Sequence, residues 1–388
     1  MSNNNLNGVC FSNAVKVCQD FQKDLGGSVA LISRDSDYFA LAKEIKDNFE
    51  DRGVTLKNIV LDDSFSPEPD TYLKLFCFPE DVTLIIAVGN SELINLARFF
   101  ATMFKIKLIA VPTEIAFMTI FSKSCYLINE KLPEQFFVQV PELCVIDLPF
   151  LAGLKKQAFA DAYCEVASKS IAFLDYKVDC ILNNTDQKEI DEVFNIITRL
   201  AKIDSEGNAC KISIINAELS MGLFLKSFGE FSASEKSLAY LLSTKKENSH
   251  FENAFFVNKP LIKLYELFLR VDTIKTKISP DYNESISDLA RLLNSSELEI
   301  IKKYKPLDFD ELISKRQALI DGGLLQIVRK LSKLIEKLED NYRFVYKGRQ
   351  KRAGFSLEEL KRVLKLSSYL YGGGLLKLLN DSGMLECL

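Results

Sequence analysis

The chain has 388 residues and a formal net charge of −4, with 47% hydrophobic and 26% charged residues. This composition is that of a globular protein and excludes collagen-like and intrinsically disordered chains. The length favours two domains. The small net charge gives no overall field that would attract nucleic acid or an anionic membrane, so we expect neither as a partner.

Cysteine usage and the N-terminal stretch indicate the compartment. Nine cysteines occur singly, with no C-x-x-C pair, which is typical of a reduced cytosolic protein. The stretch "MSNNNLNGVCFSN" has neither the basic start nor the apolar core of a signal peptide. No later stretch reaches the roughly 18 uninterrupted apolar residues of a membrane helix. We therefore expect a cytoplasmic protein.

The first part of the chain alternates apolar runs with amphipathic helices. The pattern predicts strands at residues 28–33, 56–63, 82–89 and 107–113, and helices at residues 37–53 and 91–104. Unbroken apolar strands separated by helices are typical of a parallel sheet that is covered on both faces. We predict an α/β domain with a doubly wound, Rossmann-like parallel sheet over residues 1–154.

The second part of the chain is almost entirely helical in pattern. Apolar residues recur at three- and four-residue spacing in residues 159–182, 190–204, 234–244, 259–274, 323–344 and 356–371. We predict an all-α domain over residues 155–388.

The strand at residues 82–89 runs into the turn Gly89-Asn90-Ser91-Glu92, which opens the next helix. Glycine at such a turn lets the backbone N–H groups of a helix start approach a pyrophosphate closely. A single glycine between a strand and a helix is also common in turns that bind no ligand. Glu92 suits the helix dipole, but it places negative charge where a pyrophosphate would arrive. A dinucleotide cradle and a simple turn both stay open on these residues.

The segment resembles a family signature: a strand, a Gly-Gly-Gly-Ser turn, a helix bearing Asp, and a strand ending in Val-Pro-Thr. The signature is that of the dehydroquinate synthase-like and iron-containing alcohol dehydrogenase superfamily. The chain resembles this superfamily over most of its length, most closely the glycerol-1-phosphate dehydrogenase branch. Asn95 stands at the helix Asp, and "VPTEIAF" (111–117) stands where the family has Val-Pro-Thr and then small or hydroxylated residues. The resemblance implies NAD or NADP as cofactor, bound by Asp35, Gly89, Asn90, Ser91, Asn95, Thr113 and Ser122.

Three later segments resemble the metal site of the superfamily. "AYCEVASKSIAFLDY" (162–176) places Glu165 on the first ligand position, with Lys169 matching the family lysine. "SASEKSLAYLL" (232–242) places Lys236 on the second position, and "NSHFENAFFV" (248–257) places His250, the only histidine, on the third. In the family a carboxylate and two imidazoles hold Zn²⁺ or Fe²⁺, which polarises the substrate hydroxyl. The resemblance implies a metal and substrate site in the helical domain, with Lys169, Lys236 and His250 as catalytic residues.

Lysine at the second ligand position changes the chemistry of this site. An ammonium has no lone pair and repels a divalent ion unless burial and the metal remove its proton. Lys236 therefore either replaces the cation and stabilises a developing oxygen charge directly, or forms an ion pair with Glu165 that fills an abandoned cavity. His250 is either a proton relay or a residue at a helix start, because "NSH" also fits a helix cap.

The resemblance implies an NAD(P)-linked oxidoreductase that acts on a polyol or a glycerol phosphate, with its site in the cleft between two domains and a homo-oligomeric state. A dehydroquinate synthase-like lyase or synthase is the first alternative, because those enzymes have glutamate at the position of Glu165. The second alternative is a catalytically silent relative that acts as a binding or scaffold protein. The support for this alternative is the joint replacement of two glycines, the helix Asp, the loop Asp (Met118 in this chain) and one histidine of the family pattern. A dehydrogenase is expected to bind dinucleotide even without metal, whereas a silent relative is expected to bind neither.

Overall fold

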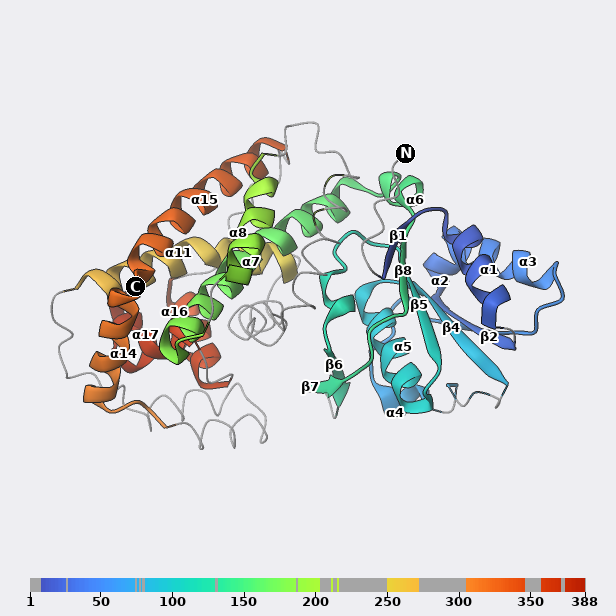
Figure 1. Ribbon diagram of the computed structural model, residues 1–388, viewed down its shortest axis with the longest axis horizontal. Helices are drawn as coiled ribbons and strands as arrows, with labels where there is room; N and C mark the ends of the chain where they lie inside the picture. Colours follow the sequence, from blue (N-terminus) through green and yellow to red (C-terminus); the bar gives the residue numbers. More distant parts are fainter. Residues whose placement is uncertain are drawn as a thin grey trace. The chain divides into compact units, whose positions relative to one another are not determined.

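A computed structural model of the chain describes residues 8–25, 27–73, 75–76, 78, 81–129, 132–185, 188–202, 211, 215, 250–271, 305–345, 357–370 and 374–387. The chain divides into two compact units. The first consists of Met1–Ala162 with Gly207–Gly229, and the second of Tyr163–Glu206 with Glu230–Leu388. The first unit contains the parallel sheet and the second is helical, which confirms the predicted fold class (Figure 1).

The main sheet of the first unit has six strands, all paired in parallel, in the order β1-β8-β5-β4-β2-β3. Its strands are β1 (Val9–Phe11), β2 (Ser28–Arg34), β3 (Leu56–Leu61), β4 (Val82–Gly89), β5 (Lys107–Pro112) and β8 (Leu143–Ile146). The four predicted strands are confirmed as β2 to β5. The short strands β1 and β8 were not predicted, because three or four residues are too few for a periodic signal. A separate antiparallel hairpin joins β6 (Ser124–Asn129) to β7 (Leu132–Phe137).

Both faces of the sheet are buried, as expected for unbroken apolar strands. Alternate residues of a strand point to opposite faces, and Val29 and Leu31 of β2 belong to the same buried cluster as side chains of α1 (Ala14–Leu25) and α3 (Lys43–Glu50). The alternate residue Ala30 is also fully buried. The helix α5 (Ser91–Phe104) packs on β4 and β5 and covers the other face (Figure 1).

The predicted helix at residues 37–53 is divided into three pieces. It consists of α2 (Asp35–Asp37), a π-helical turn η1 (Tyr38–Ala42) and α3, and the turn that follows contains Gly53 at a φ of +72°. The remaining short elements of the first unit are α4 (Pro69–Tyr72), η2 (Met118–Phe121) and α6 (Leu148–Ala152).

The second unit is built from long helices. They are α7 (Lys156–Asn183), which starts in the first unit, α8 (Lys188–Leu200), α11 (His250–Arg270), α14 (Phe309–Asp321), α15 (Leu324–Val345), α16 (Leu357–Leu370), α17 (Gly374–Asp381) and the 3₁₀ turn η4 (Met384–Cys387). The core between α11 and α15 is aromatic, because Tyr342 packs against Phe255 and Phe256. The helix predicted at residues 234–244 lies outside the described residues.

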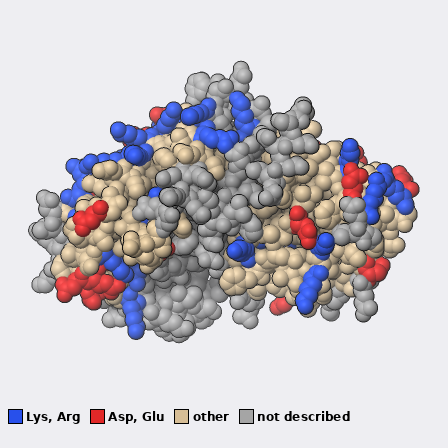
Figure 2. Space-filling view, viewed as in Figure 1, with Lys and Arg blue, Asp and Glu red and all other residues tan. Residues whose placement is uncertain are grey.

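Two surface properties of the helices bear on possible partners. Among the described helices, none has the length and apolarity that a membrane crossing requires. Figure 2 shows basic side chains along the edge where α15 runs at the upper left. That helix exposes Lys330, Lys333 and Lys337, with Glu336 and Asp340 among them. Mixed charges of this kind are typical of a solvated helix face.

Candidate functional site

The order of the strands places a candidate site at the carboxyl ends of β2 and β4. From β2 the chain continues to β3 on one side, whereas β4 and β5 lie on the other side of β2. In open parallel sheets, ligands bind outside the carboxyl ends of the strands at such a switch point. Three segments follow these strand ends and form the site: residues 34–37 after β2, 89–92 after β4 and 113–116 after β5.

The Gly89 turn starts α5 with a side-chain cap. Asn90 is extended (φ −75°, ψ 173°), and its Oδ1 accepts a hydrogen bond from the Leu93 N–H at 3.0 Å. Asparagine is among the best caps because it satisfies a helix donor that has no partner within the helix. The surroundings of Gly89 are crowded: a Cβ there would lie 3.0 Å from Leu93 Cδ2 and 3.3 Å from Asp37 Oδ2. The glycine leaves room for Leu93 of the helix and for the Asp37 carboxylate.

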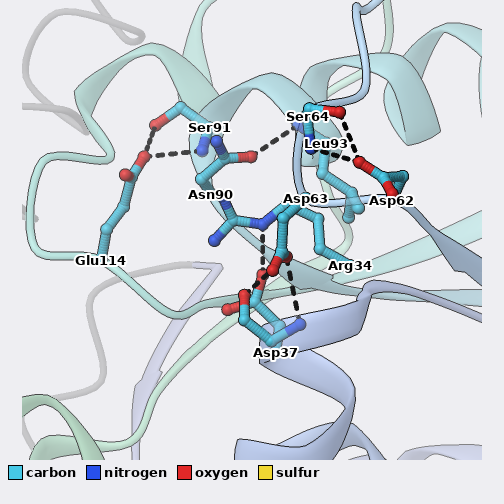
Figure 3. Close-up of polar contacts among 10 residues, drawn as sticks. Arg34, Asp37, Asp62, Asp63, Ser64, Asn90, Ser91, Leu93 and Glu114 are labelled. Atoms are coloured by element: carbon cyan, nitrogen blue, oxygen red, sulfur yellow. Dashed lines mark hydrogen bonds and ion pairs between the residues drawn. The ribbon is translucent and has the colours of Figure 1, made fainter.

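The first N–H of α5 is bound by the Glu114 carboxylate. Glu114 Oε1 accepts from both the N–H and the Oγ of Ser91, each at 2.7 Å (Figure 3). The Ser91 Oγ also lies 2.8 Å from the carbonyl oxygen of Ala116. One residue earlier, the Thr113 N–H donates to the Gly89 carbonyl at 3.0 Å, which holds the loop after β5 against the turn. The protein thus supplies an anion of its own to the helix start.

Burial raises the pKa of Glu114 to about 7, although hydrogen bonds from Ser91 act in the opposite direction. Arg34 also lowers this pKa, and Glu92 raises it, so one cation and a second carboxylate face the group. The desolvation effect is the larger because the surrounding protein leaves only part of Glu114 in contact with water. Glu114 consequently changes charge near neutral pH.

Arg34 lies between the turn and Asp37 (Figure 3). Its Nε donates to Asp37 Oδ2 at 2.5 Å, and the Asp37 side chain is 8% exposed. Farther out, the N–H and Oγ of Ser36 donate to Asp63 Oδ1 at 3.1 and 2.7 Å. Arg34 is thus held by Asp37, and its positive charge also acts on the carboxylates of Glu114 and Glu92.

The structure brings together some of the residues predicted to bind the cofactor. Gly89, Asn90, Ser91 and Thr113 adjoin one another, and Asp35 is exposed at the start of α2, just beyond β2. The Thr113 hydroxyl is buried and has no hydrogen-bond partner in the part of the chain that is described. It is therefore a donor and acceptor that a ligand could use.

Asn95 and Ser122, the other two predicted residues, contact a buried arginine. Arg98 is fully buried, and its Nη1 donates to Asn95 Oδ1 at 2.8 Å. Its Nη2 donates to the Ser122 carbonyl, and its Nε donates to the Gln139 carbonyl at 3.0 Å. Burial lowers the pKa of Arg98 to about 10. The contact with Asn95 lies within α5, whereas the contact with the Ser122 carbonyl joins α5 to a neighbouring segment. The role of Asn95 and Ser122 in cofactor binding stays a prediction.

In the helical unit, Glu165 and Lys169 lie one turn apart on α7, and both are buried. Residues four apart share a helix face, so the structure places these two predicted residues side by side. Lys236 and the side chain of His250 lie outside the described residues. Within the described part, no three His, Cys, Asp or Glu side chains are grouped to hold a metal ion. The ligand set of Glu165, Lys236 and His250 stays a prediction.

The register of α7 and α11 adds a constraint on that prediction. The rings of Tyr163 and Phe255 pack at 6.3 Å, and Asn258 Nδ2 donates to the Ala167 carbonyl at 3.2 Å, so the two helices run alongside each other in the same direction. His250 precedes Phe255 by five residues and Glu165 follows Tyr163 by two, which separates the two backbones by about 10 Å along the helices.

Comparison with known proteins agrees with this geometry. The order of the strands and the helix start at Gly89 define a Rossmann-like domain of the nucleotide-binding type. Residues 10–153 match the sequence model of the family described as iron-containing alcohol dehydrogenase. A comparison with curated protein sequences finds no match.

Solved structures extend the similarity to the whole chain. One is a 1,3-propanediol oxidoreductase, with a TM-score of 0.65 and 11% identity over 98% of this chain and 97% of that one. A second is an iron-containing alcohol dehydrogenase from Corynebacterium glutamicum, with a TM-score of 0.57 and 13% identity over 98% of this chain and 93% of that one. A third is a probable glycerol dehydrogenase from Sinorhizobium meliloti, with a TM-score of 0.58 and 12% identity over 98% of each chain. The predicted resemblance is confirmed in sequence for residues 10–153, and the solved structures show the same fold along the chain. The glycerol-1-phosphate branch stays a prediction.

Sequence reasoning missed Glu114 as a site residue. The signal was available, because Glu114 stands in "VPTEIAF" where the family has small or hydroxylated residues. A carboxylate beside a phosphate cradle is an unfavourable neighbour for a phosphate, and that conflict marks the position.

Proposed function

We propose that the chain is an NAD(P)-linked oxidoreductase that acts on an alcohol or polyol, with a glycerol phosphate as the narrower candidate substrate. The observation that carries this proposal is the match of residues 10–153 to the iron-containing alcohol dehydrogenase family. The matched part contains β2, β4, β5 and the capped start of α5. The similarity of fold along the chain also supports an oxidoreductase.

The residues that we expect to bind a dinucleotide are suited to it only in part. Asp35, which the resemblance assigns to the adenosine side of the cofactor, is exposed just beyond β2, and the Thr113 hydroxyl is without a partner among the described residues. The start of α5 does not fit, because Glu114 already accepts from Ser91. A nicotinamide, when bound, would supply the hydride acceptor. A pyrophosphate at this helix start requires that Glu114 first leave it.

On the substrate side, Glu165 and Lys169 are the described residues that we assign to the site. A buried ammonium one turn from a buried carboxylate can bind an anionic or hydroxyl group of a substrate while the carboxylate orients it. Lys236 and His250 are assigned to the same site through the family resemblance, with His250 as proton relay. No metal-dependent step is assigned, because the described residues do not make up a ligand set.

Calorimetric titration with NAD⁺, NADH, NADP⁺ and NADPH tests the proposal, before and after chelation and after Zn²⁺ is restored. Micromolar binding that does not depend on metal, together with oxidation of glycerol, propanediol or glycerol 1-phosphate, would support it and would favour Lys236 as the cation. The absence of binding by any dinucleotide up to millimolar concentration would contradict it.

A second candidate is a catalytically silent relative that keeps the fold for binding. The observation that favours it is the Glu114 carboxylate, because a site that has lost its ligand can fill the helix start with its own anion. The same titration separates the two candidates, since a silent relative binds none of the four dinucleotides.

A further inference from the structure

The contact between Glu114 and Ser91 uses the donors that a bound phosphate would need. The N-terminus of a helix attracts anions through its unpaired N–H groups and the helix dipole. In α5 the Leu93 N–H is taken by the Asn90 side chain, and the Ser91 N–H and hydroxyl are taken by Glu114 at 2.7 Å. A phosphate oxygen on the Ser91 donors would stand where Glu114 Oε1 stands.

We propose that Glu114 is a specificity-determining residue of this site: an internal anion that competes with the phosphates of a dinucleotide for the start of α5 and couples their binding to proton uptake. The inference rests on the proposed function for the identity of the ligand. The competition between Glu114 and a phosphate does not depend on the proposed function, because it can also be measured with inorganic pyrophosphate.

The charges around Glu114 determine how the coupling operates. Arg34, from the end of β2, faces it as a cation but is paired with Asp37, and Glu92, from the first turn of α5, faces it as a second anion. When Glu114 is ionised, an arriving pyrophosphate meets the carboxylates of Glu114 and Glu92 and an arginine that is already paired with Asp37. When Glu114 is protonated, one of these repulsions is removed and the Ser91 donors are released. The proton comes from the solvent on binding and returns to it on release.

Calorimetry on the full chain tests this inference with NADH and with inorganic pyrophosphate, between pH 6 and 9, in pairs of buffers with different ionisation enthalpies. The variants are Glu114→Gln, which keeps the shape of the side chain, and Glu114→Ala, which empties the position. Glu92→Gln is the matched control, because it removes one negative charge from the same helix turn but leaves the Ser91 contact in place. Circular dichroism verifies that each variant is folded.

For the wild type with NADH, whose phosphates do not titrate in this range, we expect affinity to fall by up to about tenfold for each pH unit above 7, with uptake of about one proton per NADH at pH 8. Both Glu114 variants are expected to bind both ligands at least about tenfold more tightly at pH 8, and to take up no proton with NADH. Glu92→Gln is expected to gain no more than about fivefold, as a charge near a helix end does, and to keep the proton uptake.

The outcomes separate the inference from the proposed function. Equal affinity in the wild type and both Glu114 variants for both ligands would overturn the inference, and dinucleotide binding by all of them would leave the oxidoreductase intact. If no form of the protein binds NADH but the Glu114 variants bind pyrophosphate more tightly than the wild type, the inference stands and the proposed function falls. An equal gain in Glu92→Gln would also overturn the inference, because it would show general charge repulsion.

Discussion

The Asp37 carboxylate lies where Gly89 leaves space for it: a Cβ on Gly89 would stand 3.3 Å from Asp37 Oδ2. These residues follow different strands, β2 and β4, which are neighbours in the sheet. A glycine at this turn thus leaves room for the Asp37 carboxylate from the neighbouring strand and for Leu93 from the helix.

Gly89→Ala is predicted to lower the free energy of unfolding by about 1 to 3 kcal/mol, because the added methyl group overpacks against Leu93 and Asp37. Urea denaturation followed by circular dichroism measures the change. Gly153→Ala is the control: its nearest neighbour is Phe150 O at 3.4 Å, an ordinary contact, so a change within about 0.5 kcal/mol is expected. Equal effects at the two positions would contradict the crowding at Gly89.

Asn90→Ala is predicted to lower the free energy of unfolding by about 1 kcal/mol, because the Leu93 N–H loses its side-chain acceptor. Asn90→Ser keeps an oxygen that can cap the helix, and it should retain most of the stability. Thermal unfolding of both variants distinguishes loss of the cap from a general effect of substitution at the turn. If the serine variant is as unstable as the alanine variant, the cap is not the cause.

Glu114 is predicted to make stability fall as pH rises. Its pKa is raised from 4.5 to about 7 in the folded protein, so the folded state holds the proton more tightly than the unfolded state. This contribution is fully present below pH 4.5 and is lost as pH rises through 7. Between pH 4.5 and 8, the free energy of unfolding of the wild type should fall by about 2 to 3 kcal/mol relative to that of Glu114→Gln. Urea midpoints at pH 4.5, 6 and 8 give the difference, and parallel curves for the two proteins would refute the assignment.

Arg98→Ala is predicted to lower the free energy of unfolding by about 3 kcal/mol, because it removes a fully buried side chain together with its hydrogen bonds to Asn95 and to the partly buried carbonyls of Ser122 and Gln139. Arg343→Ala is the surface control. Its ion pair with Glu339 is long, at 3.6 Å, and its side chain is 54% exposed, so a loss below about 1 kcal/mol is expected. Chemical denaturation of both variants at one pH gives the comparison, and similar losses would show that the Arg98 contacts contribute little.

Much of the first unit could be predicted from the sequence because local patterns specify it. The strand at residues 82–89, the turn at Gly89 and the helix from Ser91 each follow from apolar runs, a helix cap and periodic spacing within a short window. The parallel sheet followed from strands that are apolar without interruption. The pattern could not indicate the π-helical turn η1, because its five residues are too few to show a period different from that of an α-helix.

The same local signals indicated which segment would form a site, but they did not show what occupies it. The sequence by itself determined the strands, the helix start and the set of donors at Asn90 and Ser91. Only the tertiary structure decided that Glu114, 23 positions from Ser91, binds those donors and that Arg98 reaches Gln139, 41 positions away. The reason is physical: β5 lies beside β4, so the loop after β5 reaches the start of α5, and such pairings between distant segments leave no periodic trace in the chain.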